Sequence, residues 1–416
     1  MRLPRRVKYA VVLIIGLPAV FLLFSAVIIP LVFKATMVPV HADPARVPAQ
    51  TSAPVEPHWA FAAGEAGRMA RTLVVEDNLP GVSVAVGVDG RLVWAGGFGW
   101  ADIEARRPVT PDTLFRIGTV SKSLTAAAVG LLRQRGQLDL DAPVQRYVPA
   151  FPQKEAPITT RQAMAHIAGL RHHRGEDEYM PQTHCDNLAE ALALFADDDL
   201  KFTPGTDWRY STYGWILVSA VVESAAGRPF EEFMATDVFA PLGMRATVPD
   251  PARQPMPQRT QFYWPRAWRD TSHGLEHPTE VDYSCFTGAG YYLSTPSDLV
   301  RFAMAMDGHA LLDAETTALL QTPVTLPSGK TTGYGLGWFV ERAPFGDGET
   351  LLIHHPGIAV GGMTVLRRYP EHGIVVAVTT NVTFAKLAPF AAQVAALFAA
   401  ARSARVPARA RDDDAA

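Results

Sequence analysis

A hydroxyl residue and a lysine lie three positions apart at Thr119 and Lys122, where a helical pattern over residues 120–135 begins. Residues three positions apart share one face of a helix, so the hydroxyl and the amine would lie within reach of each other. The positive potential of a helix N-terminus favours both a developing oxyanion and a deprotonated amine. A hydroxyl attacks a carbonyl carbon only once a base accepts its proton. The pair is therefore suited to nucleophilic attack on a carbonyl group.

Serine residues at positions 121 and 123 offer alternative hydroxyls beside the lysine. Each is a direct sequence neighbour of Lys122, which places it roughly 100° around the helix from the amine. Side chains at such positions do not face each other. Ser121 and Ser123 therefore do not replace Thr119 as the hydroxyl that works with Lys122.

Further short motifs follow in a set order along the chain. They are His-Ile-Ala-Gly-Leu at 166–170, Pro-Gly-Thr at 204–206, Tyr-Ser-Thr-Tyr-Gly-Trp at 210–215, Pro-Leu-Gly-Met at 241–244, Gly-Ala-Gly at 288–290, Ser-Thr-x-x-Asp-Leu at 294–299, Tyr-Gly-Leu-Gly-Trp at 334–338 and His-Pro-Gly at 355–357. With Thr119 and Lys122, the chain resembles the serine β-lactamase-like superfamily, which includes class C β-lactamases, penicillin-binding proteins, D-Ala-D-Ala carboxypeptidases and esterases. Its motifs are most similar to those of the mitochondrial β-lactamase-like branch. The resemblance implies a hydrolase that works through an acyl-enzyme.

The resemblance assigns catalytic roles to three side chains. The first motif of the family is Ser-x-x-Lys with serine as the nucleophile, and this chain has Thr119 at the serine position. Lys122 and Tyr210 match the proton-transfer pair, and either of them is suited to be the base. The extra methyl of threonine restricts χ1 and takes up space beside the attacked carbon.

Substrate contacts follow from the second and third motifs. By similarity, the oxyanion would bind between the backbone N–H groups of Thr119 and Ile358. Thr212 stands where the second motif often has asparagine. His355 and Gly357 belong to the third motif, and the resemblance implies that they contact the substrate together with Thr212. His355 is also expected to help bind or protonate the substrate.

Two classes of function remain compatible with these residues. The first is a hydrolase that acts on a peptide, a β-lactam-like amide or an ester, with Thr119 as nucleophile. The second is a catalytically impaired relative that binds cell-wall peptides or assembles with itself. Retention of both Lys122 and Tyr210 favours the first class, because a binding scaffold has no chemical need for either.

No metal or other cofactor is expected. Residues 273–277 read His-x-x-Glu-His, like a zinc-protease motif, but that motif needs a helix. Gly274 lies inside the segment and Pro278 ends it, which argues against a helix there. The histidine pairs at 172–173 and 354–355 have side chains pointing apart and no third ligand at metal spacing.

Two cysteines, Cys185 and Cys285, form at most one disulfide bridge. In an exported region a bridge between them is possible. Buried free thiols are the alternative that the sequence leaves open.

The pattern of apolar residues predicts one antiparallel sheet built from both ends of the chain, with a helical lobe inserted into it. Expected strands are 82–88 and 91–97, joined by an Asp-Gly turn, and 338–341, 363–369 and 374–380. Expected helices are 120–135, 160–166, 188–195, 215–226, 230–238, 296–306 and 384–401. An α/β (α+β) chain of the β-lactamase/transpeptidase type, with its site in a cleft between the lobes, is therefore expected.

Residues 9–33 form an uncharged apolar stretch long enough to span a bilayer. Basic residues precede it, so the positive-inside bias would keep residues 1–8 cytoplasmic and export the rest. A long cleavable signal is the alternative, with residues 40–42 as a cleavage site. The predicted organisation is a cytoplasmic flank (1–8), a transmembrane signal-anchor (9–33), a Pro/Ala-rich linker (34–57), a hydrolase domain (58–401) and a disordered tail (402–416). The expected location is the inner membrane, with the domain on the periplasmic side.

The charge balance narrows the choice of partners. The chain has 38 Lys+Arg against 41 Asp+Glu, for a net charge of −3, and its N-terminal segment holds basic residues without an acid. The remainder is therefore acidic overall, which argues against nucleic acid as a partner. A small-molecule or peptide substrate and the membrane are the partners expected, and the oligomeric state is left open.

Overall fold

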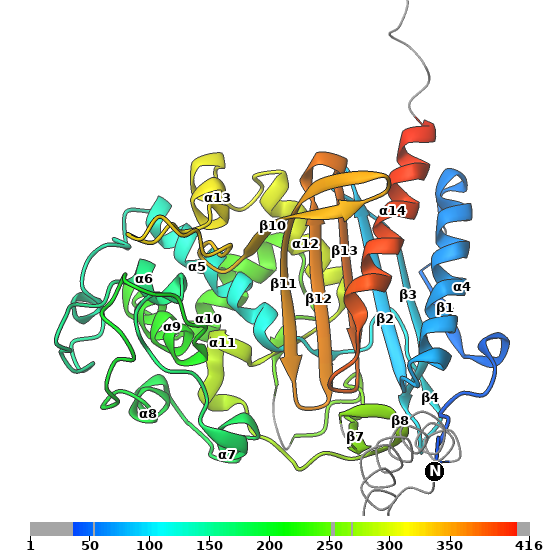
Figure 1. The fold of residues 1–416 in the computed structure, drawn as a ribbon, viewed down its shortest axis with the longest axis horizontal. Coiled ribbons are helices and arrows are strands. Elements are labelled where there is room, and N and C mark those ends of the chain that lie inside the picture. The colour runs from blue at the N-terminus through cyan, green and yellow to red at the C-terminus, as the bar shows by residue number, and fades with distance from the viewer. Residues whose placement is uncertain (1–35, 53–54, 251–253, 268, 406–416) are drawn as a thin grey trace, which may run out of the picture.

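The computed structural model describes residues 36–52, 55–250, 254–267 and 269–405. Its central antiparallel sheet has the order β1-β3-β2-β13-β12-β11-β10, with β4 paired to β3 (Figure 1). The strands are β1 (Ala49–Thr51), β2 (Gly81–Val88), β3 (Arg91–Asp102), β4 (Arg107–Pro108), β10 (Phe339–Phe345), β11 (Gly348–Ala359), β12 (Gly362–Tyr369) and β13 (Ile374–Thr380). N-terminal and C-terminal strands meet where β2 pairs with β13. The prediction of one sheet built from both ends of the chain is confirmed.

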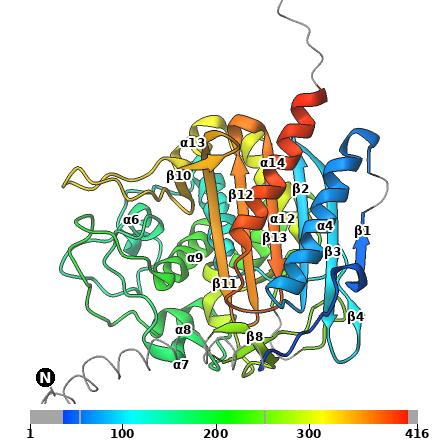
Figure 2. The ribbon, with the colours of Figure 1, turned by 45° about the vertical axis from the view of Figure 1, so that its right-hand side comes forward.

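Helices cover both faces of this sheet. Helices α4 (Ala60–Glu76) and α14 (Leu387–Arg405) lie side by side on one face (Figure 2), and α12 (Pro296–Asp307) packs on the other. The valines at 82, 84, 86 and 88 of β2 share a core with α4 and α14, whereas Ala85 belongs to the core of the opposite face. A strand that is buried on both faces needs this continuous apolar sequence.

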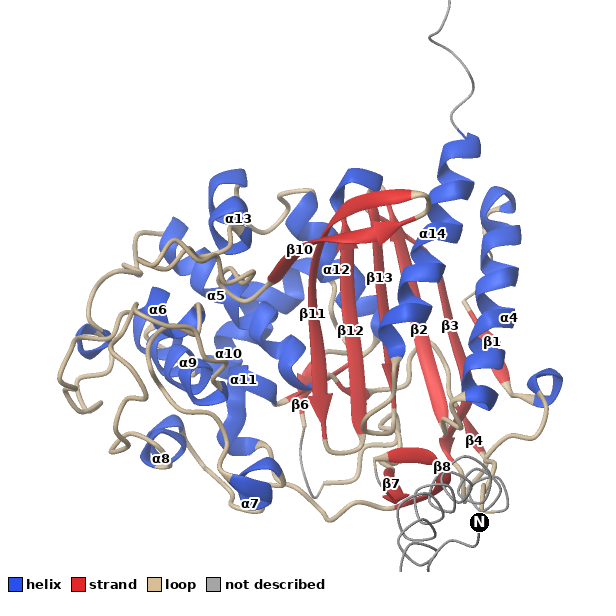
Figure 3. Ribbon diagram, in the orientation of Figure 1, coloured by secondary structure: helices blue, strands red, loops and turns tan. Residues whose placement is uncertain are grey.

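The inserted helical lobe lies beside the β11 edge of the sheet (Figure 3). Its helices are α5 (Ser121–Gln134), α6 (Thr160–Met164), α7 (Gly175–Tyr179), α8 (Leu188–Ala193), α9 (Thr212–Ala226), α10 (Phe230–Phe233), α11 (Thr287–Gly290) and α13 (Ala314–Gln321). Helix α9 is the centre of the lobe, since it contacts α5, α6, α8, α10 and α11 and is buried over residues 212–222. Ser211 caps its N-terminus through Gly214 N–H, and Gly227 ends it in the left-handed conformation.

Two small sheets complete the described fold. Strands β5 (Phe115–Arg116), β9 (Tyr292–Ser294) and β6 (Val248–Pro249) pair just before the Thr119 turn. Strands β7 (Trp264–Ala267) and β8 (Asp270–Glu276) form a hairpin. The His-x-x-Glu-His segment therefore runs along β8 into the loop that follows it, and it lacks the helix that the zinc-protease arrangement needs.

The structure differs from the predicted organisation near both termini. Residues 36–52 were expected in an extended linker, but β1 pairs with β3 and Val47 is buried in the core beneath α4. At the other end, α14 continues to Arg405, and Arg402 forms an ion pair with Asp89, so residues 402–405 belong to a helix, whereas the remainder of the predicted tail lies outside the described residues. The predicted anchor at 9–33 lies outside the described residues. Among the described helices, only α14 is long and apolar enough to cross a membrane, and it packs on the sheet.

A disulfide joins Cys185 to Cys285, which resolves the two alternatives for these cysteines. Cys185 lies shortly before α8, and Cys285 lies in the turn that leads into α11. The bridge therefore ties two separate segments of the helical lobe together.

Candidate active site

Thr119 lies in the 3₁₀ turn Gly118–Val120, which leads directly into α5. Gly118 has φ of +51°, and a Cβ there would lie 2.5 Å from the carbonyl oxygen of Ile358. A Cβ on Gly357 would lie 2.0 Å from the carbonyl oxygen of Ile117. Only glycine fits at both points, and the backbone before Thr119 therefore lies directly against β11.

Lys122 is fully buried in the first turn of α5. Its Nζ donates a hydrogen bond to the carbonyl oxygen of Ala289 at 2.9 Å, and it lies 5.0 Å from the centre of the Tyr210 ring. Burial lowers the pKa of Lys122 well below its usual range, because a charged amine loses its hydration there. A lysine with a lowered pKa is suited to accept a proton near neutral pH.

Tyr210 precedes α9 and reaches the Thr119 turn from the helical lobe. Its hydroxyl is in hydrogen-bonding contact with the Thr119 side chain. Burial raises the pKa of Tyr210, and the contact with Thr119 only partly opposes this effect. Tyr210 therefore keeps its proton near neutral pH, while burial favours the neutral amine of Lys122. The structure brings together the three side chains that the first two motifs indicated.

The expected oxyanion site lies at the free end of β11. Strand β10 pairs with β11 only as far as His354, so in the described chain residues 355–359 have a neighbouring strand on the β12 side alone. Ile358 is 44% exposed and lines the cavity beside Thr119. Gly357 is buried against the backbone of Ile117, and its expected contact with substrate stays a prediction.

His355 lines the cavity, but both of its ring nitrogens are engaged. Nδ1 donates to the carbonyl oxygen of Pro356 at 2.6 Å, and Nε2 accepts from the Tyr334 hydroxyl at 3.2 Å. Burial lowers the pKa of His355 to about 3, so the ring is neutral at pH 7. The expected transfer of a proton from His355 to substrate would first require one of these bonds to break.

Thr212, the third expected substrate contact, lines the cavity at the start of α9. Its Oγ1 is buried and has no hydrogen-bond partner in the described chain, which leaves it available to a substrate. Its backbone N–H donates to Nδ1 of His172 at 3.3 Å. His172 therefore presents its other nitrogen as a donor, and it is a cavity residue for which the sequence offered no motif.

The cavity above Thr119 has a volume of about 840 Å³. Aromatic and apolar side chains supply much of its wall: Tyr179, Met180, Trp264, Pro265, Phe339, Phe384. Four charged side chains line it as well: Glu176, Arg266, Arg269, Glu276. Arg266 and Arg269 are exposed on the β7–β8 hairpin, where Arg266 donates to the carbonyl oxygen of Leu275 and Arg269 lies over the Phe384 ring. The charge is therefore held by exposed side chains.

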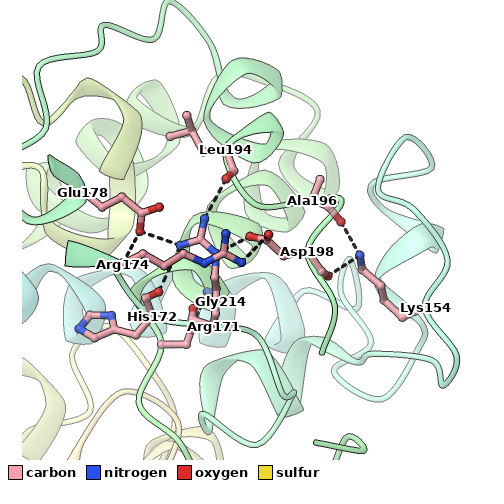
Figure 4. Close-up of polar contacts among 10 residues, drawn as sticks. Lys154, Arg171, His172, Arg174, Glu178, Leu194, Ala196, Asp198 and Gly214 are labelled. Atoms are coloured by element: carbon pink, nitrogen blue, oxygen red, sulfur yellow. Dashed lines mark hydrogen bonds and ion pairs between the residues drawn. The ribbon is translucent and has the colours of Figure 1, made fainter. Parts of the chain in front are cut away.

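The wall formed by residues 171–179 is anchored by Arg171 (Figure 4). The Arg171 guanidinium lies between Glu178 and Asp198, and it also donates to the carbonyl oxygen of Leu194 at 3.1 Å. Arg174 donates to the other oxygen of Asp198 at 2.7 Å. Arg171 is only 5% exposed, so its own charge-assisted bonds are shielded from solvent, whereas Arg174 is exposed. They join α7, which borders the cavity, to the interior of the lobe.

An antiparallel sheet with an inserted helical lobe, and a hydroxyl, lysine and tyrosine at their junction, defines a protein of the β-lactamase and penicillin-binding type. Residues 61–400 match the Beta-lactamase family model, and the chain belongs to that family.

The chain is similar to known proteins over most of its length or over part of it. The human mitochondrial serine β-lactamase-like protein LACTB is 29% identical over 79% of this chain and 78% of its own. Esterase EstB of Burkholderia gladioli is 36% identical over 41% of this chain and 47% of the esterase. The D-amino acid amidase of Ochrobactrum anthropi SV3 is a structural neighbour with a TM-score of 0.65 and 25% identity, covering 83% of this chain and 97% of the amidase.

Proposed function

We propose that this protein hydrolyses esters or amides through an acyl-enzyme formed on the Thr119 hydroxyl. One observation carries the proposal: the hydroxyl contacts Tyr210 at the base of an open cavity, and the buried Lys122 packs against the same tyrosine. Membership of the family supports it, as does the likeness to proteins named as an esterase and an amidase. Peptides, β-lactam-like amides and carboxylic esters are the candidate substrates.

The chemistry assigns each group a step. Thr119 Oγ1 attacks the substrate carbonyl carbon and passes its proton to the Lys122–Tyr210 pair, while backbone N–H groups of Thr119 and Ile358 bind the oxyanion. The tetrahedral adduct then expels the leaving group, which takes that proton. Water next attacks the acyl-threonine ester and gives a proton to the same pair. Release of the carboxylic acid returns the proton to Thr119.

The surroundings of Thr119 favour a substrate that is uncharged beside the scissile bond. His355 is neutral with both nitrogens engaged, and Pro356 has neither a hydroxyl nor an N–H to offer. Lys122 donates to Ala289 and is buried. A carboxylate placed next to these groups would lose hydration without gaining a partner. We therefore expect simple esters to react faster than substrates with a carboxylate next to the reacting carbonyl.

The test uses the full chain with p-nitrophenyl butyrate, a chromogenic cephalosporin and a D-amino acid p-nitroanilide. Turnover of the ester, together with labelling of Thr119 by a fluorophosphonate located by mass spectrometry, is the expected result. Labelling at another residue would remove Thr119 from its role. Absence of both turnover and labelling would overturn the hydrolase proposal.

A second function, binding of cell-wall peptides without catalysis, is favoured by one observation. The Thr119 hydroxyl donates its hydrogen to the Pro356 carbonyl oxygen at 2.9 Å, and Lys122 Nζ donates to the Ala289 carbonyl oxygen. Each group is thus bonded to a backbone carbonyl, and neither of these hydrogen bonds can carry a proton from Thr119 to Lys122. Calorimetric titration with a D-Ala-D-Ala peptide distinguishes the two functions. Tight binding without turnover would support the second.

We also propose that residues 9–33 anchor the protein in the inner membrane with the domain in the periplasm. The uncharged length of this segment and the basic residues before it support the proposal. The domain would then act on substrates outside the cytoplasm.

A further inference from the structure

We propose that His166 is a positioning residue that fixes the Tyr210 side chain against Thr119 and Lys122. His166 follows α6 in the His-Ile-Ala-Gly-Leu motif, and it bonds to the residues on both sides of Tyr210. Its carbonyl oxygen accepts from Arg209 N–H at 3.0 Å. Its Nδ1 accepts from Ser211 N–H at 3.1 Å. One residue therefore holds the backbone immediately before and after Tyr210.

The imidazole also packs on the Tyr210 ring itself. The two ring centres are 4.2 Å apart with an angle of 35° between the planes, and the Tyr334 ring lies 4.7 Å from the imidazole. His166 is 2% exposed, so its ring has little freedom to move away from Tyr210. Backbone bonds and ring packing together define where the phenol hydroxyl lies.

The backbone of His166 shows that this contact is specifically built. His166 has φ of +61°, in the left-handed region that few residues other than glycine and asparagine adopt readily. This conformation places the carbonyl and the ring of one residue on the two flanks of Tyr210. Since Nδ1 accepts a hydrogen bond, the ring must be neutral with its proton on Nε2. A neutral ring adds no charge beside Lys122.

The role differs from that of a group that transfers protons. Nδ1 is occupied by Ser211 N–H and cannot accept a proton while that bond holds, and the ring packs against the Tyr210 ring. Displacement of a catalytic group by about 1 Å is enough to cost on the order of 10²-fold in rate. The kinetic part of this inference rests on the proposed hydrolase function, whereas the placement of Tyr210 does not.

The first experiment measures ester hydrolysis by the full chain with His166→Leu and His166→Asn. Leucine removes the acceptor, and we expect kcat to fall about 10²-fold with little change in KM. Asparagine keeps an acceptor oxygen at the position of Nδ1 and tolerates positive φ, so it should restore kcat to within about tenfold of wild type. In a Tyr210→Phe background, His166→Leu should cost less than about threefold more, because both changes affect the same hydroxyl.

The matched control is His41→Leu. His41 is also buried, bonds to a backbone carbonyl oxygen, that of Pro80, at 3.0 Å and packs on an aromatic ring, that of Trp100. It lies in the N-terminal segment and not at the cavity, so its loss should lower the melting temperature without changing kcat. An equal loss of kcat in His166→Leu and His41→Leu would show that His166 acts only through the general stability of the fold, and it would overturn the inference.

A second measurement does not depend on turnover. With 3-fluorotyrosine incorporated at position 210, the fluorine NMR signal should be single and sharp in wild type and shifted or broadened by His166→Leu. An unchanged signal in a folded His166→Leu variant would overturn the inference. A changed signal in a protein that hydrolyses no substrate would contradict the proposed function and leave the positioning of Tyr210 supported.

Discussion

The Thr119 hydroxyl and the His355 imidazole donate hydrogen bonds to the same atom, the carbonyl oxygen of Pro356, at 2.9 Å and 2.6 Å. The Thr119 hydroxyl also contacts the Tyr210 hydroxyl, so its oxygen lies between a backbone carbonyl oxygen and the phenol. The Thr119 hydroxyl hydrogen therefore has to turn away from Pro356 before Thr119 can pass its proton to the Lys122–Tyr210 pair. Such turning needs no movement of the backbone.

Replacing Thr119 tests whether its hydroxyl is the nucleophile. Thr119→Ser removes the methyl but keeps the hydroxyl, and the smaller side chain turns more freely, so ester hydrolysis should stay equal or rise. Thr119→Ala should abolish labelling by a fluorophosphonate, measured by intact-protein mass spectrometry. Labelling that persists in Thr119→Ala would place the nucleophile elsewhere, with Ser121 the next residue to examine.

The Lys122–Tyr210 pair should behave as one unit. Lys122→Ala and Tyr210→Phe are each expected to lower kcat/KM by roughly 10²–10⁴-fold, and the double variant should be little worse than either. Lys201→Ala, on an exposed lysine away from the cavity, serves as the control with unchanged activity. Small losses of kcat/KM that add up in the double variant would show that Lys122 and Tyr210 act independently. Thermal unfolding of each variant distinguishes a loss of chemistry from a loss of fold.

The disulfide should contribute strongly to stability because it closes a loop with a sequence separation of 100 residues. Replacing Cys185 and Cys285 together by serine is expected to lower the free energy of unfolding by roughly 2–4 kcal/mol, as measured by urea denaturation. Wild type measured in a reductant should shift by a similar amount, while the serine variant should not respond to the reductant. Equal stability of the variant and oxidised wild type would show that the bridge is dispensable.

Stability should fall as the solution becomes acidic, because buried histidines stay neutral in the fold. Burial lowers the pKa of His355 to about 3 and that of His166 well below its usual value. In the unfolded chain both histidines have a pKa of about 6.5, so unfolding takes up protons below that pH. Their contribution is complete above pH 6.5 and decreases as the pH falls from there toward 3.

Urea denaturation between pH 7.5 and 5 measures this dependence. Each histidine accounts for up to about 1.4 kcal/mol of the free energy of unfolding per pH unit. His355→Gln should therefore make the dependence on pH less steep. A free energy of unfolding that is flat over this interval would show that these rings accept protons in the folded protein.

Membrane topology is tested with alkaline phosphatase fused after residue 60. The fusion should be active and should sediment with membranes, because the apolar span would carry the reporter across the bilayer and remain embedded. A fusion after residue 8, which lacks the span, should be inactive and soluble. A soluble, active product that begins at Asp43 would instead identify the segment as a cleaved signal.

Much of the sheet was predictable because its signals are local. The Asp89-Gly90 turn between two apolar runs predicts the β2–β3 hairpin, which the structure confirms. Helix α4 was not predicted, since its buried residues are mainly alanines and do not form the spaced pattern of large apolar side chains that marks a helix. Strand β11 was missing from the predicted strands, because histidines, a proline and a glycine interrupt its apolar pattern.

The candidate site likewise combines residues that sequence motifs predict with atoms that no motif predicts. Thr119, Lys122 and Tyr210 could be predicted from motifs, and the structure brings them together. The carbonyl oxygen of Ala289 that binds Lys122 and the Pro356 carbonyl oxygen that binds Thr119 are backbone atoms. Their positions depend on how α11 and β11 pack on α5, and no side-chain pattern encodes them.

The pairing of β13 between β2 and β12 has a consequence for how the protein is made. β13 is the last strand of the chain, yet it lies in the interior of the sheet. Until residues 374–380 leave the ribosome, β2 and β12 each present an open apolar edge, and such edges are prone to aggregate. The N-terminal strands can therefore pair with the rest of the sheet only after nearly the whole chain has emerged. The interval before the last strand inserts is therefore when a newly synthesised chain is most exposed to aggregation.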